Sequence, residues 1–311
     1  MNEMLITQHT AIAAKELTQD LKDRFVAFID AKPKTVETYS KAIRQLFEFF
    51  GAHGINRPSR DDIMAFREEL KATGHKPTTI QNYITATRLF FQWTAHEGIY
   101  QNIAEHIKGA TISRDHKKDY LTSRQVKAVL ADIDRATAQG KRDYAMLVLM
   151  VTGGLRTIEV VRADVGDLRT VGDNSVLFIQ GKGRDEKSEY VNLNAQVEAA
   201  LRDYLKTRGN VREEDPLFTS ASNNNRGQRM TTRAISGIAK AHMRGAGYNS
   251  DRLTAHSLRH TAVTLSLLAG KRLEEVQQFA RHANIATTMI YNHALDRSKN
   301  GCSEAIAKAI F

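Results

Sequence analysis

Apolar residues in the first hundred positions recur every three or four residues, as one buried helical face requires. The spacing predicts a helix over 36–50, stopped by Gly51 and Gly54, and a second helix over 80–91. Weaker patterns of the same kind predict two further helices, around 16–31 and 60–73. Four such segments joined by short polar breaks indicate a compact four-helix unit.

The pattern changes after this unit. Residues 109–119 lack apolar periodicity and carry basic and polar side chains, which predicts an interdomain linker. This places a helical domain at 16–108 and a second domain at 120–311. A length of 311 residues independently favours two domains, because a single hydrophobic core rarely grows so large.

The second domain combines helices with a small sheet. Residues 144–151 are almost entirely apolar, which predicts a buried helix, and the break at 152–154 ends it. Alternation of β-branched residues occurs only around 175–180 and 189–193, so we expect one antiparallel hairpin. Helices resume from Asn194. The predicted fold is mainly α: a four-helix domain, then an α+β domain of helices with a small antiparallel sheet.

Charge adds a candidate partner. The chain has 45 Lys and Arg against 35 Asp and Glu, a net charge of +10. Residues 110–311 carry 31 basic and 22 acidic side chains, so nearly all of the excess lies in the second domain. A basic surface of this kind favours a polyanion such as nucleic acid. The charge alone fits an ordinary basic domain equally well.

Several classes of protein are disfavoured. The longest apolar run, 145–151, is too short to cross a bilayer, and residues 1–14 lack the pattern of a secretory signal. The only cysteine, Cys302, can form neither an internal disulfide nor a cysteine-rich metal site. We therefore expect a protein of the cytoplasm with no membrane contact.

Two familiar chemistries find no support in the sequence. The glycine-containing segment 181–187 lies between predicted strands and lacks the pattern of a phosphate-binding loop. His256 and His260 are four residues apart on a predicted helix, but position 257 is serine where a zinc-binding HExxH motif needs glutamate. Neither nucleotide hydrolysis nor a metal site is predicted.

Charged and nucleophilic residues stand at predicted helix starts and breaks in the second domain. Each has an ordinary explanation, since arginines are usually solvated and a tyrosine beside an isoleucine fits simple packing. Their joint occurrence in a basic domain, with Lys182 at a hairpin tip, favours one shared site. The set comprises Arg156, His256, Arg259, His282 and Tyr291.

These residues also stand in the order of a known family. An Arg-x-x-Glu follows a Thr-Gly break, a His-x-x-Arg-His box comes later, and a further histidine precedes a tyrosine. The blocks read Thr152–Glu159, His256–His260 and His282–Tyr291, with Lys182 on the predicted hairpin. The chain therefore resembles the tyrosine recombinases, the family of the phage integrases. It departs from the family pattern at Arg281, where glycine usually precedes the second histidine.

The resemblance implies a site-specific DNA recombinase that cleaves and rejoins strands through a covalent 3′-phosphotyrosine. It implies Tyr291 as the nucleophile and Lys182 as the general acid that protonates the leaving 5′ oxygen. Arg156 and Arg259 suit a pentavalent phosphorus, because a guanidinium is always charged and can bind two oxygens at once.

The remaining roles follow from the same resemblance. His256 and His282 add donors or take the tyrosine proton, and Glu159 orients a neighbouring basic group. This chemistry implies neither a metal nor a cofactor, because the phosphotyrosine conserves the energy of the broken bond.

An assembly is implied as well. A core-binding domain and a catalytic domain clamp double-stranded DNA, with Lys117 and Lys118 of the linker near phosphates. Four protomers, all identical or shared with a related recombinase, exchange strands to integrate, excise or resolve DNA. The apolar stripe of residues 303–311 docks on a neighbouring protomer, or else packs on its own domain. The short stretch before the first helix favours a Xer-like, integron-type or small mobile-element integrase acting at the nucleoid.

Two other functions remain open at this point. A type IB topoisomerase-like enzyme uses the same chemistry to relax DNA, although the short chain and the helical first domain disfavour it. A DNA-binding protein that keeps the fold without catalysis is the other alternative. The complete set of arginine, lysine, histidine and tyrosine residues disfavours that alternative.

Overall fold

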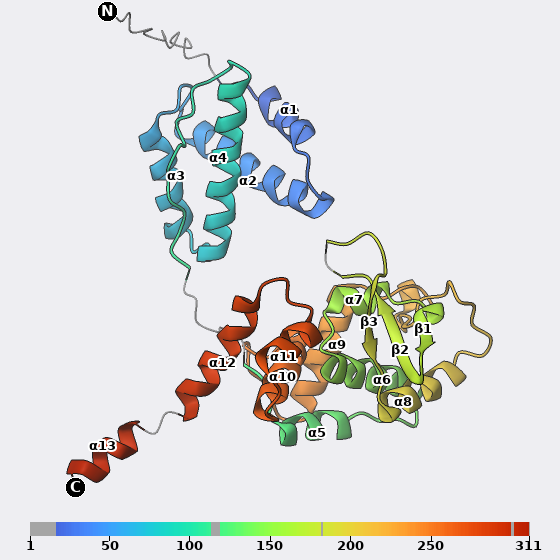
Figure 1. Ribbon diagram of the computed structural model, residues 1–311. Helices are drawn as coiled ribbons and strands as arrows, with labels where there is room; N and C mark the ends of the chain where they lie inside the picture. The colour runs from blue at the N-terminus through green and yellow to red at the C-terminus, as the bar shows by residue number, and fades with distance from the viewer. Residues whose placement is uncertain (1–16, 113–118, 182, 300–301, 311) are drawn as a thin grey trace, which may run out of the picture. The chain divides into compact units, whose positions relative to one another are not determined.

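The computed structural model describes residues 17–112, 119–181, 183–299 and 302–310. The chain divides into two compact units, Met1–Arg114 and Asp115–Phe311 (Figure 1). Each unit has its own hydrophobic core. None of the described helices is both long and apolar enough to cross a membrane.

The first unit contains the four predicted helices. They are α1 (Asp20–Phe28), α2 (Pro33–Ala52), α3 (Arg60–Ala72) and α4 (Pro77–His96). Phe90 lies at the centre of their core, with its ring centroid 5.3 Å from that of Phe25 and 5.6 Å from that of Phe47. Edge-to-face aromatic packing of this kind favours close helix contact.

Two of the predicted helix ends are wrong. The helix expected over 16–31 is shorter, because Ile29 adopts an extended conformation and Lys32 precedes a proline, which disfavours helical backbone. Of the two predicted stops, Gly51 falls inside α2, whereas the chain turns at Gly54 with a φ of +64°.

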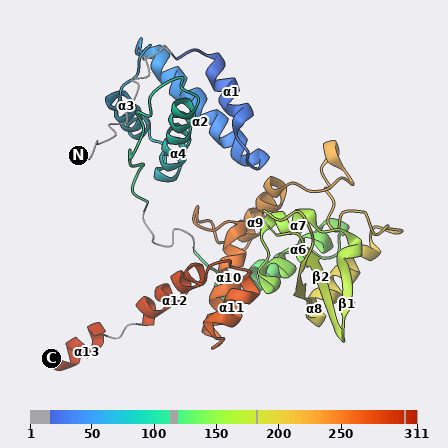
Figure 2. The ribbon, with the colours of Figure 1, turned by 45° about the horizontal axis from the view of Figure 1, so that its top comes forward.

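The second unit combines helices with one sheet. Its elements are α5 (Ser123–Ala131), α6 (Ala138–Gly153), α7 (Thr157–Arg162), η1 (Val165–Asp167), β1 (Leu168–Val171), β2 (Asn174–Ile179), β3 (Glu189–Asn192), α8 (Ala195–Lys206), η2 (Asn223–Asn225), α9 (Thr232–Gly245), α10 (Ala255–Leu268), α11 (Leu273–Ala280), α12 (Ile285–Lys299) and α13 (Cys302–Ile310). Figures 1 and 2 show the sheet at one end of this unit and α10, α11 and α12 toward the other. The predicted fold class is confirmed.

The sheet has one more strand than the sequence predicts. Its order is β1-β2-β3, antiparallel throughout, with Leu177 paired to Leu168 on one side and Val191 on the other. The predicted hairpin is confirmed as β2 and β3. Strand β1 was missed because it has four residues, most of them exposed, and therefore shows no apolar alternation.

Two elements position the candidate site. Helix α6 is buried at every position over 145–151, which confirms the prediction for that stretch. Helix α10 contacts α6, α9, α11 and α12, and residues 257–264 along it are all buried.

The expectation of helices throughout the chain after Asn194 is wrong for 207–231, which holds only η2 and isolated bridges.

Candidate active site

The turn between α6 and α7 places Arg156. Gly154 ends α6 with a φ of +58°, and a Cβ there would lie 3.1 Å from the Phe279 ring, so both backbone and space favour glycine. Two residues later, Arg156 is the N-cap of α7. The Thr-Gly break seen in the sequence is thus the end of one helix and the start of the next.

Glu159 holds Arg156 in place. The Arg156 backbone N–H donates to Glu159 Oε2 and its Nη1 donates to Oε1, both at 2.8 Å. A residue three positions after the N-cap can reach back in this way, which explains the Arg-x-x-Glu spacing. Burial alone would raise the pKa of the fully buried Glu159 carboxyl. Arg281 and Arg156 outweigh burial and hold that pKa below its ordinary value.

Arg259 approaches the same turn from α10. It is 1% exposed, and its Nη1 donates to the Gly154 carbonyl at 2.6 Å. Its Nη2 donates to the carbonyl of Ala280 at the end of α11. Burial, with the nearby Arg156 and Arg281, lowers the pKa of Arg259 to about 10, which leaves it protonated at neutral pH.

Helix α12 supplies the phenol. Asn284 begins this helix by accepting from the Ala286 N–H at 2.8 Å. Thr288 and Tyr291 are three residues apart and therefore lie on one face. His282 Nδ1 shares a hydrogen bond of 2.9 Å with Thr288 Oγ1. The His282 and Tyr291 rings are stacked with centroids 6.2 Å apart.

The buried setting determines the protonation of both rings. Burial, with Arg259 and Arg156 nearby, lowers the pKa of His282 to about 4, so the imidazole is neutral at physiological pH. Burial raises the pKa of Tyr291 to about 12, although the same two arginines oppose the shift. The resting phenol is therefore protonated and must lose its proton before or during any nucleophilic attack.

Two histidines of α10 complete the cluster. His256 is exposed, while His260 is buried and one helical turn further along. Their ring centroids are 4.5 Å apart, and the His260 ring lies 5.2 Å from that of Tyr291. Among the residues with described positions, no group of three or more His, Cys, Asp or Glu could hold a metal ion.

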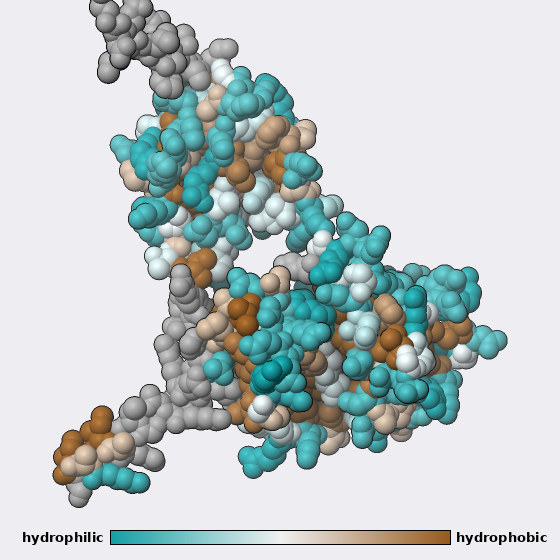
Figure 3. Space-filling model, in the orientation of Figure 1, coloured by the Kyte–Doolittle hydropathy of each residue, from teal (hydrophilic) through white to brown (hydrophobic). Residues whose placement is uncertain are grey.

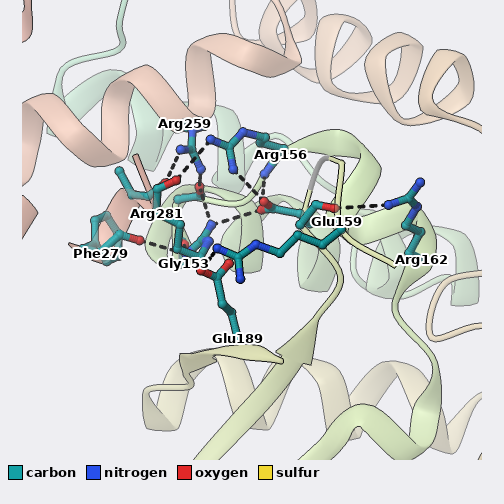
Figure 4. Close-up of polar contacts among 12 residues, drawn as sticks. Gly153, Arg156, Glu159, Arg162, Glu189, Arg259, Phe279 and Arg281 are labelled. Carbon is teal, nitrogen blue, oxygen red and sulfur yellow. Dashed lines mark hydrogen bonds and ion pairs between the residues drawn. The ribbon is translucent and has the colours of Figure 1, made fainter. Parts of the chain in front are cut away.

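The structure brings together six of the residues singled out in the sequence. They are Arg156, Glu159, His256, Arg259, His282 and Tyr291 (Figure 4 shows the arginines and Glu159). Lys182 and the linker lysines Lys117 and Lys118 lie outside the described residues. Lys187, the other lysine of the predicted hairpin, is held in ion pairs with Asp164 and Asp167.

Three members of the cluster were not predicted. His260 belongs to the His-x-x-Arg-His box but was considered only as a metal ligand. Thr288 belongs to the Thr-Thr pair that precedes the tyrosine in the family pattern, but no role was expected for it. Arg281 was noticed only as a departure from glycine, yet its guanidinium is 3.0 Å from Glu159 Oε2, inside the cluster (Figure 4).

Comparison with known proteins identifies the family. Residues 119–298 match the phage integrase family, and this match covers more than half of the chain. The chain belongs to that family. Residues 25–98 of this integrase-family chain match the N-terminal SAM-like domain of phage integrases. The resemblance seen in the sequence is confirmed.

Relatives of the integrase-family chain are tyrosine recombinases. One, from Synechococcus elongatus, is 27% identical over 291 residues, which cover 89% of this chain and 90% of the relative. Tyrosine recombinase XerC of Roseiflexus castenholzii is 30% identical over 273 residues, 83% of this chain and 82% of the relative. The chain is therefore a tyrosine recombinase, an enzyme of DNA strand transfer.

Solved structures share the fold. The XerH site-specific recombinase in a post-cleavage complex with palindromic difH substrate has a TM-score of 0.73 at 21% identity, covering 88% of this chain and 80% of that one. A lambda integrase (75–356) dimer bound to a COC′ core site has a TM-score of 0.69 at 14% identity, covering 88% and 97%. At these identities the likeness shows a common architecture.

Proposed function

We propose that this chain cleaves and rejoins double-stranded DNA at specific sites through a covalent 3′-phosphotyrosine on Tyr291. One observation carries the proposal: the buried Tyr291 phenol lies in the field of Arg259 and Arg156, within a cluster of three arginines whose carboxylate is Glu159, paired with Arg156 and Arg281. Such a cluster has an excess of fixed positive charge next to a nucleophile. A phosphodiester is the electrophile that this charge attracts.

The chemistry balances without a cofactor. Tyr291 Oη attacks the phosphorus, the bond to the 5′ oxygen breaks, and a phosphotyrosine forms. The phenolic proton passes to a base, His256 or His282, and the 5′ oxygen takes a proton from Lys182. Rejoining is the reverse reaction, with the 5′ hydroxyl attacking the phosphotyrosine.

The arginines stabilise the charge that develops during these steps. Arg156 and Arg259 donate to the non-bridging oxygens, and the exposed His256 adds a donor at the entrance. Because Arg259 is 1% exposed and Tyr291 is 6% exposed, a phosphate reaches them only after neighbouring elements move. Binding of DNA therefore includes a rearrangement of the site.

The rest of the chain binds DNA and assembles with other protomers. We assign residues 16–108 to a core-binding domain, 109–119 to a DNA-contacting linker and 120–311 to the catalytic domain. The side chains of Ile306 and Ile310 lie one turn apart on α13 and are exposed, and Figure 3 shows hydrophobic residues gathered there. This supports docking of α13 on a neighbouring protomer within a tetramer, formed with identical subunits or a related recombinase.

One assay series tests the function. The protein is incubated with nicked suicide substrates, which trap a covalent complex because the cleaved fragment is lost. Sequencing of DNA trapped in the host then identifies the site. Exchange between two such sites supports a recombinase, whereas relaxation of supercoiled DNA without exchange supports a topoisomerase-like enzyme. Binding without a covalent complex would leave only the non-catalytic alternative.

The proposed location of the protein is the cytoplasm, at the nucleoid.

The linker lysines provide a test of DNA contact. Replacing Lys117 and Lys118 together with glutamine should reduce the slope of log affinity against log salt by about 2, because each phosphate contact contributes about 0.9. The measurement is a titration of a fluorescent duplex at several salt concentrations. A scrambled duplex serves as the control and should lose affinity in parallel. An affinity independent of salt in the unmodified protein would contradict phosphate contact altogether.

The general acid has a chemical test. Lys182→Ala should slow cleavage of ordinary DNA by about 10²- to 10⁴-fold while binding persists, because the 5′ alkoxide leaves without a proton donor. A substrate with sulfur at the bridging 5′ position needs no protonation and should restore most of the rate. Lys187→Ala is the matched control, since Lys187 is already paired with Asp164 and Asp167. Sulfur rescue of Lys187→Ala instead of Lys182→Ala would reassign the acid.

A further inference from the structure

Arg281 has an unusual backbone for an arginine. It ends α11 in the left-handed region, with φ of +54° and ψ of +48°. A residue with a Cβ is disfavoured there, and the family pattern noted in the sequence has glycine at this position. The arginine therefore needs a compensating interaction from its side chain.

The side chain makes that interaction inside the site. Its guanidinium side chain is 7% exposed and donates from Nη2 to Glu159 Oε2 at 3.0 Å and to the Gly154 carbonyl at 3.1 Å. Its Nη1 donates to the Phe279 carbonyl at 2.8 Å and approaches that of Gly153 at 3.4 Å. Arg281 thus joins the end of α11 to the α6–α7 turn (Figure 4).

The same contacts change the charge around Arg156. Glu159 is fully buried, with Oε1 bound by the Arg156 guanidinium and Oε2 by both Arg281 and the Arg156 backbone N–H. Without Arg281, Arg156 would be the one guanidinium hydrogen-bonded to this carboxylate among the described residues. With Arg281 present, two guanidinium groups pair with one carboxylate, so a net positive charge is left beside Arg156 for an external anion.

The contacts of Arg281 also affect His282, because the two residues are adjacent in the chain. His282 follows Arg281 directly, and the Arg281 carbonyl accepts from Arg156 Nη2 at 3.4 Å. The carbonyl of Gly154 accepts from both Arg259 and Arg281. A change in the Arg281 side chain therefore acts on the turns that carry Arg156 and His282 together.

We propose that Arg281 is a positioning residue for strand cleavage, which neutralises Glu159 and ties the turn bearing His282 to the turn bearing Arg156. It acts through those residues and does not contact the phosphate. The inference rests on the proposed function. The role proposed for Arg281 is not one that the usual glycine of the family pattern could fill, because glycine has no side chain to neutralise Glu159.

The test compares Arg281→Gly with the unmodified protein. The variant relieves backbone strain but removes the guanidinium, and we expect the covalent complex to form about 10- to 100-fold more slowly on a nicked substrate. Equilibrium affinity for the same duplex should change by less than about 3-fold, since phosphate contacts spread over the whole DNA-binding surface determine it. Thermal unfolding is followed in parallel.

Two further measurements separate positioning from folding. Arg281 lines a surface hollow of about 550 Å³ with Tyr190 of β3 and Phe279 of α11, through which a small cation can enter. Millimolar guanidinium chloride should accelerate Arg281→Gly but not the unmodified protein, while urea at equal concentration should accelerate neither. Glu159→Gln should also slow the unmodified protein by a larger factor than it slows Arg281→Gly, because the two groups act as a pair.

The outcomes are distinct. A cleavage rate unchanged in Arg281→Gly would overturn the inference, and so would equal losses of rate and affinity that guanidinium does not restore. If Arg281→Gly is unfolded at the assay temperature, Arg281→Met replaces it, because methionine keeps a long side chain but removes the charge. Slow cleavage with retained affinity then supports the inference, and a full rate overturns it. If the unmodified protein forms no covalent complex, the proposed function is refuted. The interaction between the Arg281 and Glu159 side chains would then be measured from thermal unfolding of the two variants.

Discussion

Tyr291→Phe should abolish the covalent complex between this chain and DNA. The change removes one oxygen and keeps the ring that lies against His260 and His282. We therefore expect a melting temperature within about 4 °C of the unmodified protein and unchanged affinity for DNA. Loss of a nucleophile that no other group replaces should lower the rate at least about 10³-fold. The measurement is a nicked suicide substrate analysed on a denaturing gel.

Other phenols in the second unit supply the control. Tyr190 lies on β3, is 47% exposed and packs its ring against that of Phe178, so Tyr190→Phe should give the full covalent band. Tyr144, Tyr204 and Tyr248 are further phenols in that unit. A DNA-linked band that persists in Tyr291→Phe would show that another residue attacks, and every role assigned here would need revision.

Arg259→Ala should produce the second large effect, on both rate and stability. Removing a fixed donor for a developing negative charge typically lowers a rate by about 10²- to 10³-fold. The substitution also leaves the Ala280 carbonyl without this donor, at a cost of about 1–3 kcal/mol, whereas the Gly154 carbonyl keeps its hydrogen bond from Arg281. Relief of repulsion from Arg156 and Arg281 offsets part of that cost. Single-turnover cleavage and thermal unfolding measure the two effects separately.

Two substitutions separate charge from geometry. Arg259→Lys keeps a cation but cannot donate to both carbonyls and a phosphate at once. We expect it to regain stability relative to Arg259→Ala while cleavage stays at least about 10-fold slow. Arg272→Ala, at a side chain that is 77% exposed before α11, should leave rate and stability unchanged. Wild-type cleavage by Arg259→Ala would contradict a role for this guanidinium in the reaction.

Local signals in the sequence determined most of the helices and the order of the site residues. Thr122, for example, begins α5 by accepting from the Gln125 N–H, and Gly154 ends α6 in a left-handed turn. Such signals act between residues within about four positions of each other, so they can be read from the chain without its fold. The spacing of Arg156 and Glu159 belongs to the same class, because a helix N-cap and its third residue meet locally.

Only the tertiary structure decided which of these residues meet. Arg259 binds the carbonyl of Gly154, 105 positions earlier, because α10 packs against α6, and no local preference encodes that contact. Strand β1 exists because it pairs with β2, although its exposed residues show no alternation. The sequence also left open whether the Arg281 side chain points inward or toward solvent. An arginine at a helix end is usually solvated. Here the side chain points inward because a buried carboxylate, Glu159, is within reach. Local propensity thus shaped the elements, while packing and the pairing of buried charge assembled the site.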